Sequence, residues 1–526
     1  MTTPVTVEVA GLPNQPAVLA ELVADGVPEK IISRDASLWG ADAEPEATVR
    51  LGWLDAVERA RPLLAELETL RGELAGEGLT RVVLCGMGGS SLAPEVICRS
   101  FGRPLTVLDS THPDQVRTAL GGDLAATVVV VSSKSGGTLE TDSQRRAFVQ
   151  AFTAAGVDPR KHIVVVTDPG SPFAQLAQDE GYRSVFLADP NVGGRYSALT
   201  AFGLVPCALA GADVGRLVDD AAALAPTLGK DDSPALVLAS ALGAGGLAGR
   251  DKVVLDAAGS DLLGFGDWAE QLIAESTGKR GKGLLPVVVE SDAPELAQPA
   301  ADVHVVRIGG PVPTAGTAVG GPLGGQFLAW EYAVAVAGRV LGIDPFDQPD
   351  VESAKKAARG LLGARPGPDP AAFVDGAVEV RGTPGLLDGV GTLDEAVTAL
   401  LDTILDGKGY LAVMAYLDRQ RDAALAQVRA PLARRTGRPV TFGWGPRFLH
   451  STGQFHKGGP AVGSFLQVTG GLTEDLPIPD RPFTFGELIA AQASGDATVL
   501  ADHGRPVLRL HLRSAAGLAQ VVQALS

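Results

Sequence analysis

The chain has 526 residues, enough for two to four domains, and its formal net charge of −17 argues against a general binder of nucleic acids or anionic membranes. No apolar run reaches the roughly 18 residues of a membrane span, and Met1–Ala10 lacks the basic and apolar regions of a signal peptide. The three cysteines are isolated and form no CxxC pair, which predicts reduced, buried thiols and a cytoplasmic protein. Alternating β-branched runs and Ala- and Leu-rich stretches predict an α/β fold.

The first part of the chain predicts a helical segment followed by a doubly wound unit. Residues 14–75 carry apolar residues at helical spacing. A strand at 80–86 then enters a glycine-rich turn, Gly86–Pro94, which lacks the GxGxxG pattern with a downstream acid, so dinucleotide binding is disfavoured. Further strands are expected at 105–109 and 162–168. Ligand loops of such a unit lie at the carboxyl ends of its strands.

A loop rich in hydroxyl groups separates a β-branched strand, 126–131, from a predicted helix, 139–154. Gly136 and Gly137 allow backbone N–H groups to point inward, and unpaired N–H groups at a helix N-terminus favour an anion. The plainer interpretation is a hydroxyl-rich turn with an N-cap. The Walker pattern is absent, so a sugar phosphate fits better than a nucleoside triphosphate. The candidate phosphate-binding residues are Ser133, Lys134, Ser135, Gly137, Thr138 and Thr141.

Two segments beyond this loop carry candidate catalytic side chains. Arg195, in Asn191–Ser197, is either a surface arginine beside a turn or a clamp for an anion or enolate. A second α/β unit spans residues 212–365, with an amphipathic helix predicted at 265–276. Glu275 lies near the end of that helix, about one turn after Gln271, and is either a solvated carboxylate or a catalytic one.

The rest of the chain predicts a third α/β unit after a proline-rich linker, 366–370. Strands are expected at 409–417, 439–443, 463–468 and 506–512, and a basic helix at 418–435, broken near Pro431. A Gly-rich loop, 445–460, holds His450 and His456, two of the seven histidines. Metal binding by this pair lacks a third ligand, so a catalytic or substrate-closing loop is the favoured interpretation.

Taken together, these motifs resemble phosphoglucose isomerase, a family built from two sugar-isomerase (SIS) domains. The resemblance extends over about residues 80–360 and follows the family's order of motifs. Five segments carry it: Gly86–Ser91, similar to the family's sugar-binding turn, with Gly88, Gly89 and Ser90; Ser133–Thr141, similar to its phosphate loop; Val192–Ser197, with the essential arginine; Glu275–Lys279, with the catalytic base; and Phe346–Lys355, with an active-site lysine.

The chain departs from the family pattern in two respects. Gln326, a candidate sugar-binding residue, is followed by Phe327 where the family has a Gly-Gln-His helix start, so His450 or His456 is expected to supply the ring-opening residue. The third unit resembles the C-terminal part of the actinobacterial type and of transaldolase–phosphoglucose isomerase fusions, without the transaldolase half. The predicted organisation is a helical N-terminal segment, 1–77; two SIS domains, 78–211 and 212–365; and a C-terminal α/β domain, 366–526.

The resemblance implies an aldose–ketose isomerase that interconverts glucose 6-phosphate and fructose 6-phosphate through a cis-enediol. It implies Glu275 as the base, Arg195 as the stabiliser of the enediolate, and Lys355 together with a histidine for ring opening. No metal or nucleotide cofactor, nucleic-acid partner or membrane partner is expected, and a homodimer is the expected assembly. Two alternatives stay open: a non-catalytic SIS-type sensor of sugar phosphates, and an isomerase that acts on mannose 6-phosphate. An amidotransferase-linked isomerase would need an N-terminal cysteine, whereas the first cysteine is Cys85.

Overall fold

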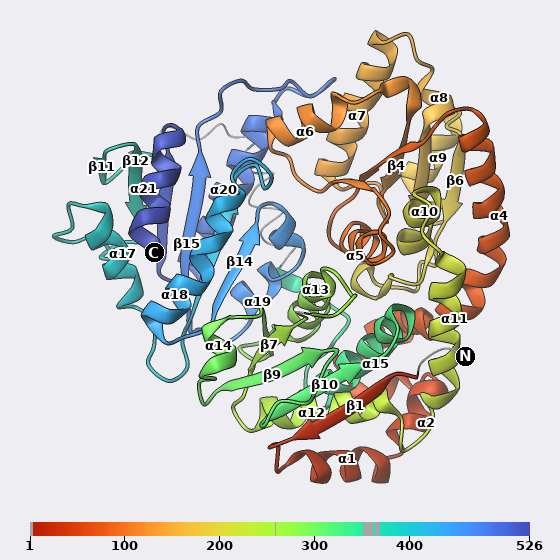
Figure 1. The fold of residues 1–526 in the computed structure, drawn as a ribbon, viewed down its shortest axis with the longest axis horizontal. Coiled ribbons are helices and arrows are strands. Elements are labelled where there is room, and N and C mark those ends of the chain that lie inside the picture. Colours follow the sequence, from red (N-terminus) through yellow and green to blue (C-terminus); the bar gives the residue numbers. More distant parts are fainter. Residues whose placement is uncertain (1–3, 258, 351–359, 361, 363–368) are drawn as a thin grey trace.

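Three β-sheets organise the molecule (Figure 1). The computed structural model describes residues 4–257, 259–350, 360, 362 and 369–526. Each sheet is dominated by parallel strands with helices on its faces, so the predicted α/β fold is confirmed. Lys355, a predicted active-site residue, lies outside the described residues.

The first sheet has the strand order β3-β2-β4-β5-β6, and all its strands are parallel. Every residue of its central strand β4 is buried. This is the pattern expected of a β-branched run that helices cover on both faces. Its strands are β2 Arg81–Cys85, β3 Thr106–Leu108, β4 Thr127–Ser132, β5 Ile163–Thr167 and β6 Ser184–Leu187.

The second sheet repeats this arrangement, with the order β8-β7-β9-β10-β1. Strand β1 comes from the N-terminal segment and pairs antiparallel with β10, whereas the other pairs are parallel. Strands β1 and β10 were not predicted from the sequence, because both are short and β10 begins and ends with glycine. The strands are β1 Thr6–Ala10, β7 Lys252–Asp256, β8 Leu285–Val288, β9 Val303–Ile308 and β10 Gly316–Gly320.

The helices around these two sheets share one large apolar core, in which α15 is buried along most of its length. The N-terminal segment contributes α1 Gln15–Ala24, α2 Val27–Ile32, η1 Ala36–Trp39, α3 Glu44–Arg50, η2 Leu51–Asp55 and α4 Ala56–Gly76. The first unit adds η3 Gly88–Ser90, α5 Leu92–Ser100, α6 Pro113–Leu120, η4 Leu124–Ala126, α7 Leu139–Ala154, α8 Pro159–His162, α9 Pro172–Asp179, η5 Gly194–Tyr196 and α10 Ala201–Leu209. The second adds α11 Val214–Leu224, η6 Ala225–Thr227, α12 Pro234–Leu247, α13 Phe265–Thr277, α14 Pro294–Ala297 and α15 Leu323–Leu341.

The third sheet has the order β11-β12-β16-β15-β13-β14, with parallel strands from β16 to β14 and two antiparallel strands at the other edge. Its strands are β11 Phe373–Asp375, β12 Val378–Gly382, β13 Tyr410–Tyr416, β14 Val440–Trp444, β15 Gly463–Gly470 and β16 Val507–Leu512. Its helices are α17 Leu393–Leu401, η7 Ala423–Val428, α18 Arg429–Thr436, η8 Arg447–His450, α19 Gly453–Gly458, α20 Phe485–Asp502 and α21 Ala515–Leu525.

Two predictions for the third unit were wrong in detail. The helix expected over 418–435 is a 3₁₀ turn, η7, followed by α18, because Pro431 lies in the first turn of a helix, where its missing N–H costs nothing. The expected loop over 445–460 contains two helical turns, η8 and α19.

The third unit packs against both of the others. Ile478, Phe485 and Leu488 join the apolar cluster on one face of the first sheet. Tyr410 and Phe455 join a cluster with β7, β8 and β9 of the second sheet. In Figure 1 the third unit, in blue, therefore borders both the orange first unit and the green second unit, with α13 and α19 near the junction.

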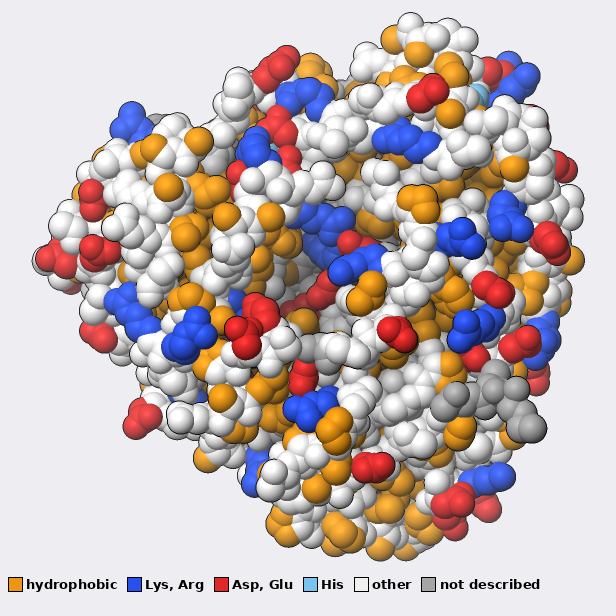
Figure 2. Space-filling model, in the orientation of Figure 1, with side chains coloured by type: hydrophobic (Ala, Val, Ile, Leu, Met, Phe, Trp, Pro, Cys, Tyr) orange, Lys and Arg blue, Asp and Glu red, His pale blue; other side chains and the backbone are white. Residues whose placement is uncertain are grey.

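The face in Figure 2 is hollowed near its centre, close to where Figure 1 shows α5 and α13, and basic and acidic side chains gather there. The three cysteines are buried and unpaired, as predicted. None of the helices in the described part of the chain is long and apolar enough to cross a lipid bilayer.

Candidate active site

Glu275 lies on the last turn of α13 with its carboxylate buried beside two polar side chains. Gln271, one turn earlier on the same helix face, donates from Nε2 to Glu275 Oε1 over 3.3 Å. Arg195 Nη1 lies 3.4 Å from Glu275 Oε2. Gln271 Oε1 is buried and has no hydrogen-bond partner among the described residues. The carboxylate is therefore held by an amide and a guanidinium, and an amide oxygen beside it remains available to a ligand.

Arg195 is a buried cation whose N–H groups are all engaged. Its Nε donates to Ser276 Oγ over 2.9 Å, and its Nη1 donates to Gln348 Oε1 over 2.8 Å as well as to Glu275. Its Nη2 donates to the carbonyl oxygens of Pro345 and Asp347 over 2.7 and 3.0 Å. The guanidinium thus fixes the 345–348 segment against the end of α13 and keeps a positive charge next to the carboxylate.

The glycine-rich turn η3 packs directly against these groups. Gly88 has a φ of +54°, and a Cβ there would lie 2.9 Å from Gln271 Nε2 and 3.0 Å from His450 Cβ. A Cβ on Gly89 would lie 1.9 Å from the carbonyl oxygen of Gly194, beside Arg195. Only glycines allow this turn, the arginine segment and α13 to approach so closely.

We expect Gly89→Ala to destabilise the fold by about 1–3 kcal/mol, because the backbone of Gly194 must move away from the new methyl group. The same movement displaces Arg195 from Glu275. Chemical denaturation measures the first effect. Gly194→Ala is the matched control, since a Cβ there meets nothing within 4 Å. Equal stability of the two variants would contradict the close contact.

The hydroxyl-rich loop lies between β4 and α7, and Thr138 is the residue just before the helix. Ser133 Oγ accepts from the Gly136 N–H over 3.2 Å and lies 3.3 Å from Thr138 Oγ1. Gly136 has a φ of +72°, and a Cβ there would lie 2.3 Å from Phe173 Cβ. Ser135 Oγ accepts from the Gly137 N–H over 3.2 Å, so the side chains of this loop order its backbone N–H groups.

Two other residues predicted to bind the phosphate have different surroundings. Lys134 Nζ lies 2.7 Å from Asp168 Oδ2 and donates to Pro190 O, so its ammonium is held away from the loop hydroxyls. Thr141 is buried in the first turn of α7, and its Oγ1 has no hydrogen-bond partner among the described residues.

His450 comes from η8 of the third unit and meets the helix that follows the hydroxyl-rich loop. Its Nε2 lies 3.1 Å from Glu140 Oε1, and both side chains are about one-tenth exposed. Glu140 also accepts from Gln492 Nε2 over 2.7 Å. A carboxylate partner on Nε2 favours the tautomer with the proton there, which leaves Nδ1 as an acceptor.

A buried ion cluster anchors η8 at the junction of the units. Arg447 Nη1 binds Glu95 of α5 and lies 2.9 Å from Asp109 Oδ2. Burial alone would raise the pKa of Glu95, but Arg447 and Arg419 lower it to about 2. Because Arg447 is only three residues before His450, this cluster sets where the imidazole lies.

His456 and Gln326 are not brought to the Glu275 cluster. His456 Nδ1 lies 3.0 Å from the Tyr410 hydroxyl, its ring stacks on that of Tyr410, and burial lowers its pKa to about 3. It belongs to the apolar interior because α19 is helical and turns it away from His450. Gln326 bonds to Val319 O and Trp330 Nε1 and lines a separate cavity of about 460 Å³ with Asp220.

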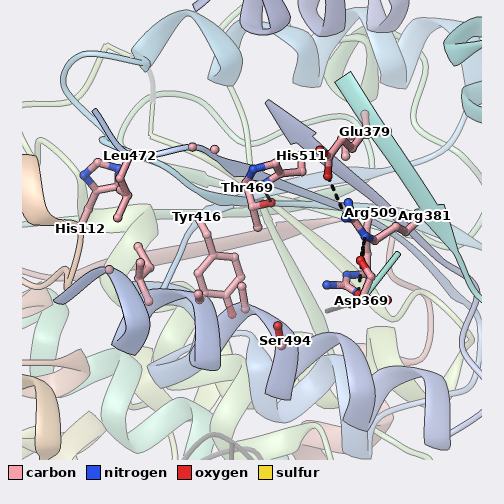
Figure 3. A pocket seen from close by; sticks show the side chains of 17 residues that line it. His112, Asp369, Glu379, Arg381, Tyr416, Thr469, Leu472, Ser494, Arg509 and His511 are labelled. Atoms are coloured by element: carbon pink, nitrogen blue, oxygen red, sulfur yellow. Dashed lines mark hydrogen bonds and ion pairs between the residues drawn. The ribbon is translucent and has the colours of Figure 1, made fainter. Parts of the chain in front are cut away.

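A cavity of about 420 Å³ lies between α20 and the third sheet (Figure 3). Arg381 and Arg509 at one end are paired with Glu379 and Asp369, and Tyr416 forms part of its wall. This cavity is lined by none of the residues around Glu275, namely Gly88, Arg195, Gln271 and His450.

One group of possible metal ligands occurs among the described residues, at His112, Asp114 and Asp418. Asp114 is already paired with two arginines, Arg117 and Arg421. Asp418 Oδ1 accepts two backbone N–H groups. Arginine partners and backbone N–H groups of the following turn occupy these oxygens, so the donor set is poor for a cation.

Lys279, just after α13, forms an ion pair over 2.6 Å with Asp347 in the segment that Arg195 binds. Burial, reinforced by the positive charge of Arg195, lowers the pKa of Lys279 to about 8. A lysine is charged below its pKa, so the pair is present at pH 7 and is lost as the pH rises through about 8.

We therefore expect activity to fall above pH 8, because loss of the ion pair frees the 345–348 segment, which carries the carbonyl partners of Arg195, from the end of α13. Lys279→Arg should move this decline to higher pH, since an arginine stays charged. Asp347→Asn should show no such decline, because it lacks the ion pair at every pH. A pH profile of kcat/KM is measured for the wild type and for both variants. An identical decline in all three proteins would show that the ion pair between Lys279 and Asp347 does not cause it.

Comparisons with known proteins agree with these motifs. Residues 58–224 match the family model for phosphoglucose isomerase, which confirms the predicted resemblance. The chain is 34% identical over 254 residues to a glucose-6-phosphate isomerase of Thermosynechococcus vestitus, covering 45% of this chain and 47% of that protein. It is 35% identical over 272 residues to the isomerase of Citrifermentans bemidjiense, covering 46% and 51%. The chain spans about half the length of these curated relatives.

Two solved structures have a similar fold. A hypothetical protein from Thermus thermophilus has a TM-score of 0.60 at 24% identity and covers 68% of this chain and all of its own. A glucose-6-phosphate isomerase from Chlamydia trachomatis has a TM-score of 0.51 at 20% identity and covers 62% and 75%. At such identities the likeness concerns the fold.

Proposed function

We propose that this protein is an aldose–ketose isomerase that interconverts glucose 6-phosphate and fructose 6-phosphate. The observation that carries the proposal is the convergence of Glu275, Arg195, Gln271 and His450 on the Gly88 turn. His450 links this cluster to the hydroxyl-rich loop, because its partner Glu140 lies two residues after Thr138. A phosphorylated hexose fits a site with an anion cradle at one end and a paired carboxylate at the other.

In this mechanism the 6-phosphate binds the hydroxyl groups of Ser133, Ser135 and Thr138 and the N–H groups of their loop. The phosphate takes no part in the chemistry, so its binding energy serves to place C1 and C2. Gln271 Oε1 accepts a hydrogen bond from a sugar hydroxyl near the reacting carbons, which gives a partner to a buried oxygen that has none among the described residues.

Ring opening comes first, since the hexose phosphate is mainly cyclic. His450 moves a proton between the ring oxygen and O1, with Glu140 holding the imidazole in the tautomer that leaves Nδ1 unprotonated. The family resemblance assigns a share of this step to Lys355, which lies outside the described residues.

Hydrogen transfer follows. Glu275 takes the proton from C2 as the C2–H electrons form the C1=C2 bond of the enediol and O1 gains a proton. The same carboxylate then returns a proton to C1 as the O2–H proton leaves and the C2 carbonyl forms. Arg195 keeps its positive charge beside the enediolate oxygen that develops in between.

We also propose a cytoplasmic homodimer, on the family resemblance and on the reduced, buried cysteines. Sedimentation of the purified protein tests the assembly. The mass of a dimer is expected. A monomer at assay concentration would contradict the proposed homodimer and would leave the proposed isomerase mechanism unaffected.

The activity is tested with the purified full chain in the presence of a metal chelator. Glucose 6-phosphate and mannose 6-phosphate are supplied in parallel, and fructose 6-phosphate is measured. We expect turnover of glucose 6-phosphate and none that depends on added metal or nucleotide. Binding without turnover would favour a sugar-phosphate sensor, and faster turnover of mannose 6-phosphate would change the assigned substrate.

A further inference from the structure

We propose that Gln492, held by Thr111, is a positioning residue that keeps Glu140 and His450 in the geometry for ring opening. The inference rests on the proposed function. It assigns part of that function to α20 of the third unit, more than 350 residues from Glu140 in the chain.

Gln492 bridges the first and third units with both ends of its amide. Its Nε2 donates to Glu140 Oε1 over 2.7 Å, and its Oε1 accepts from Thr111 Oγ1 over 2.7 Å. Glu140 Oε1 lies 3.1 Å from His450 Nε2. All four side chains are buried, so water does not compete for these hydrogen bonds.

The orientation of the amide explains why Thr111 matters. An amide can be turned so that either its oxygen or its NH₂ faces Glu140, and the oxygen would repel the carboxylate. The hydroxyl of Thr111 donates to the amide oxygen and so directs the NH₂ group to Glu140. The carboxylate then accepts from Gln492 and His450 on one oxygen, which limits its rotation and that of the imidazole.

The helix that carries Gln492 is a rigid support. Thr484 and Glu487 form a capping box at the start of α20, and Phe485 packs in the core of the first sheet. Gln492 O accepts from the Tyr416 hydroxyl over 3.5 Å, and Tyr416 lines the cavity beside this helix (Figure 3). The third unit therefore supplies both the histidine and the residue that fixes the partner of that histidine.

The experiment separates ring opening from hydrogen transfer. Ring opening interconverts the two anomers of glucose 6-phosphate, and NMR exchange spectroscopy measures that rate without isomerisation. Binding of glucitol 6-phosphate, which cannot form a ring, reports the phosphate site and the fold. The variants are Gln492→Leu, Thr111→Val and Thr111→Ser, with Ser494→Ala on the same helix as the matched control.

We expect Gln492→Leu to slow anomer interconversion by about 10- to 100-fold while glucitol 6-phosphate binds as before. Thr111→Val should slow it by about 3- to 10-fold, and Thr111→Ser, which keeps the hydroxyl, should restore most of the rate. The double variant that combines Gln492→Leu with Thr111→Val should be no slower than Gln492→Leu alone, because both changes act through the same amide group. Ser494→Ala should match the wild type.

A wild-type rate in Gln492→Leu would overturn the inference, and so would equal rates in Thr111→Val and Thr111→Ser. Parallel losses of anomer interconversion and glucitol 6-phosphate binding would also overturn it, since they indicate a structural role. If the wild-type protein itself turns over no sugar phosphate, the proposed function fails instead, and the two failures are distinguishable.

Discussion

Glu275→Gln is expected to lower kcat for isomerisation by about 10²–10⁴-fold, the usual contribution of a general base. Glutamine has the same shape and keeps an oxygen for Arg195, so the network around Arg195 should persist. It cannot take a proton from C2. KM and the anomer interconversion rate should therefore change little, and a coupled assay together with NMR exchange measures both.

Glu270→Gln is the matched control for this variant. Glu270 lies on the same helix, burial raises the pKa of its carboxyl group, and glutamine keeps nearly the same shape. We expect activity near that of the wild type. If Glu275→Gln also kept activity within about threefold of the wild type, Glu275 would not be the base.

His450→Gln is expected to lower the rate of anomer interconversion by about 10²-fold or more, because the ring oxygen and O1 lose their proton carrier. Isomerisation should fall in parallel when the substrate is supplied as the cyclic sugar phosphate. Glu275→Gln should show the opposite pattern, with slow isomerisation and normal anomer interconversion. The two variants together separate the two chemical steps.

His456→Gln is the comparison that tests the choice of histidine. His456 packs in an apolar cluster beside Tyr410, so its replacement should lower the denaturation midpoint and leave anomer interconversion close to normal. A loss of anomer interconversion in His456→Gln, with a normal rate in His450→Gln, would reverse the assignment of the ring-opening residue.

Long elements with a clear pattern were predictable from the sequence. The helix over 139–154 has the predicted bounds, because its apolar residues have helical spacing after a strong turn. The strand predicted at 409–417 is observed at Tyr410–Tyr416, because it is a continuous apolar run. Strands β1 and β10 were missed because both are short and β10 begins and ends with glycine. The pairing of β1 with the second sheet depends on contacts more than 300 residues away.

Residues of the candidate site were predictable where they lie in a recognisable sequence motif. Glu275 and Arg195 were expected to act together, and the structure brings them within 3.4 Å. Gln271 had a local signal, since it lies four residues before Glu275 on a helix, but no role could be assigned to it from the sequence. Glu140 lies inside the Ser133–Thr141 segment but was assigned no role, and Gln492 had no local signal, because the contact between them depends on how the third unit docks on the first.

The histidines and Gln326 show the limit of spacing arguments. His450 and His456 are six residues apart in what was expected to be one loop, so the sequence could not separate them. The helical turns η8 and α19 give them different partners. Gln326 matched a family segment, yet it lies at the start of α15, where it bonds to Val319 and Trp330.

Isomerisation in D₂O tests most directly whether one carboxylate moves the hydrogen between the two carbons. Glucose 6-phosphate with hydrogen at C2 is converted, and NMR measures deuterium at C1 of the fructose 6-phosphate formed. A proton held by Glu275 exchanges with solvent, so we predict deuterium at a single stereochemical position of C1 and almost none with Glu275→Gln. Deuterium at both stereochemical positions of C1 would show that no single base protonates one face, and uptake by Glu275→Gln at the wild-type rate would indicate another base; either result would contradict the mechanism.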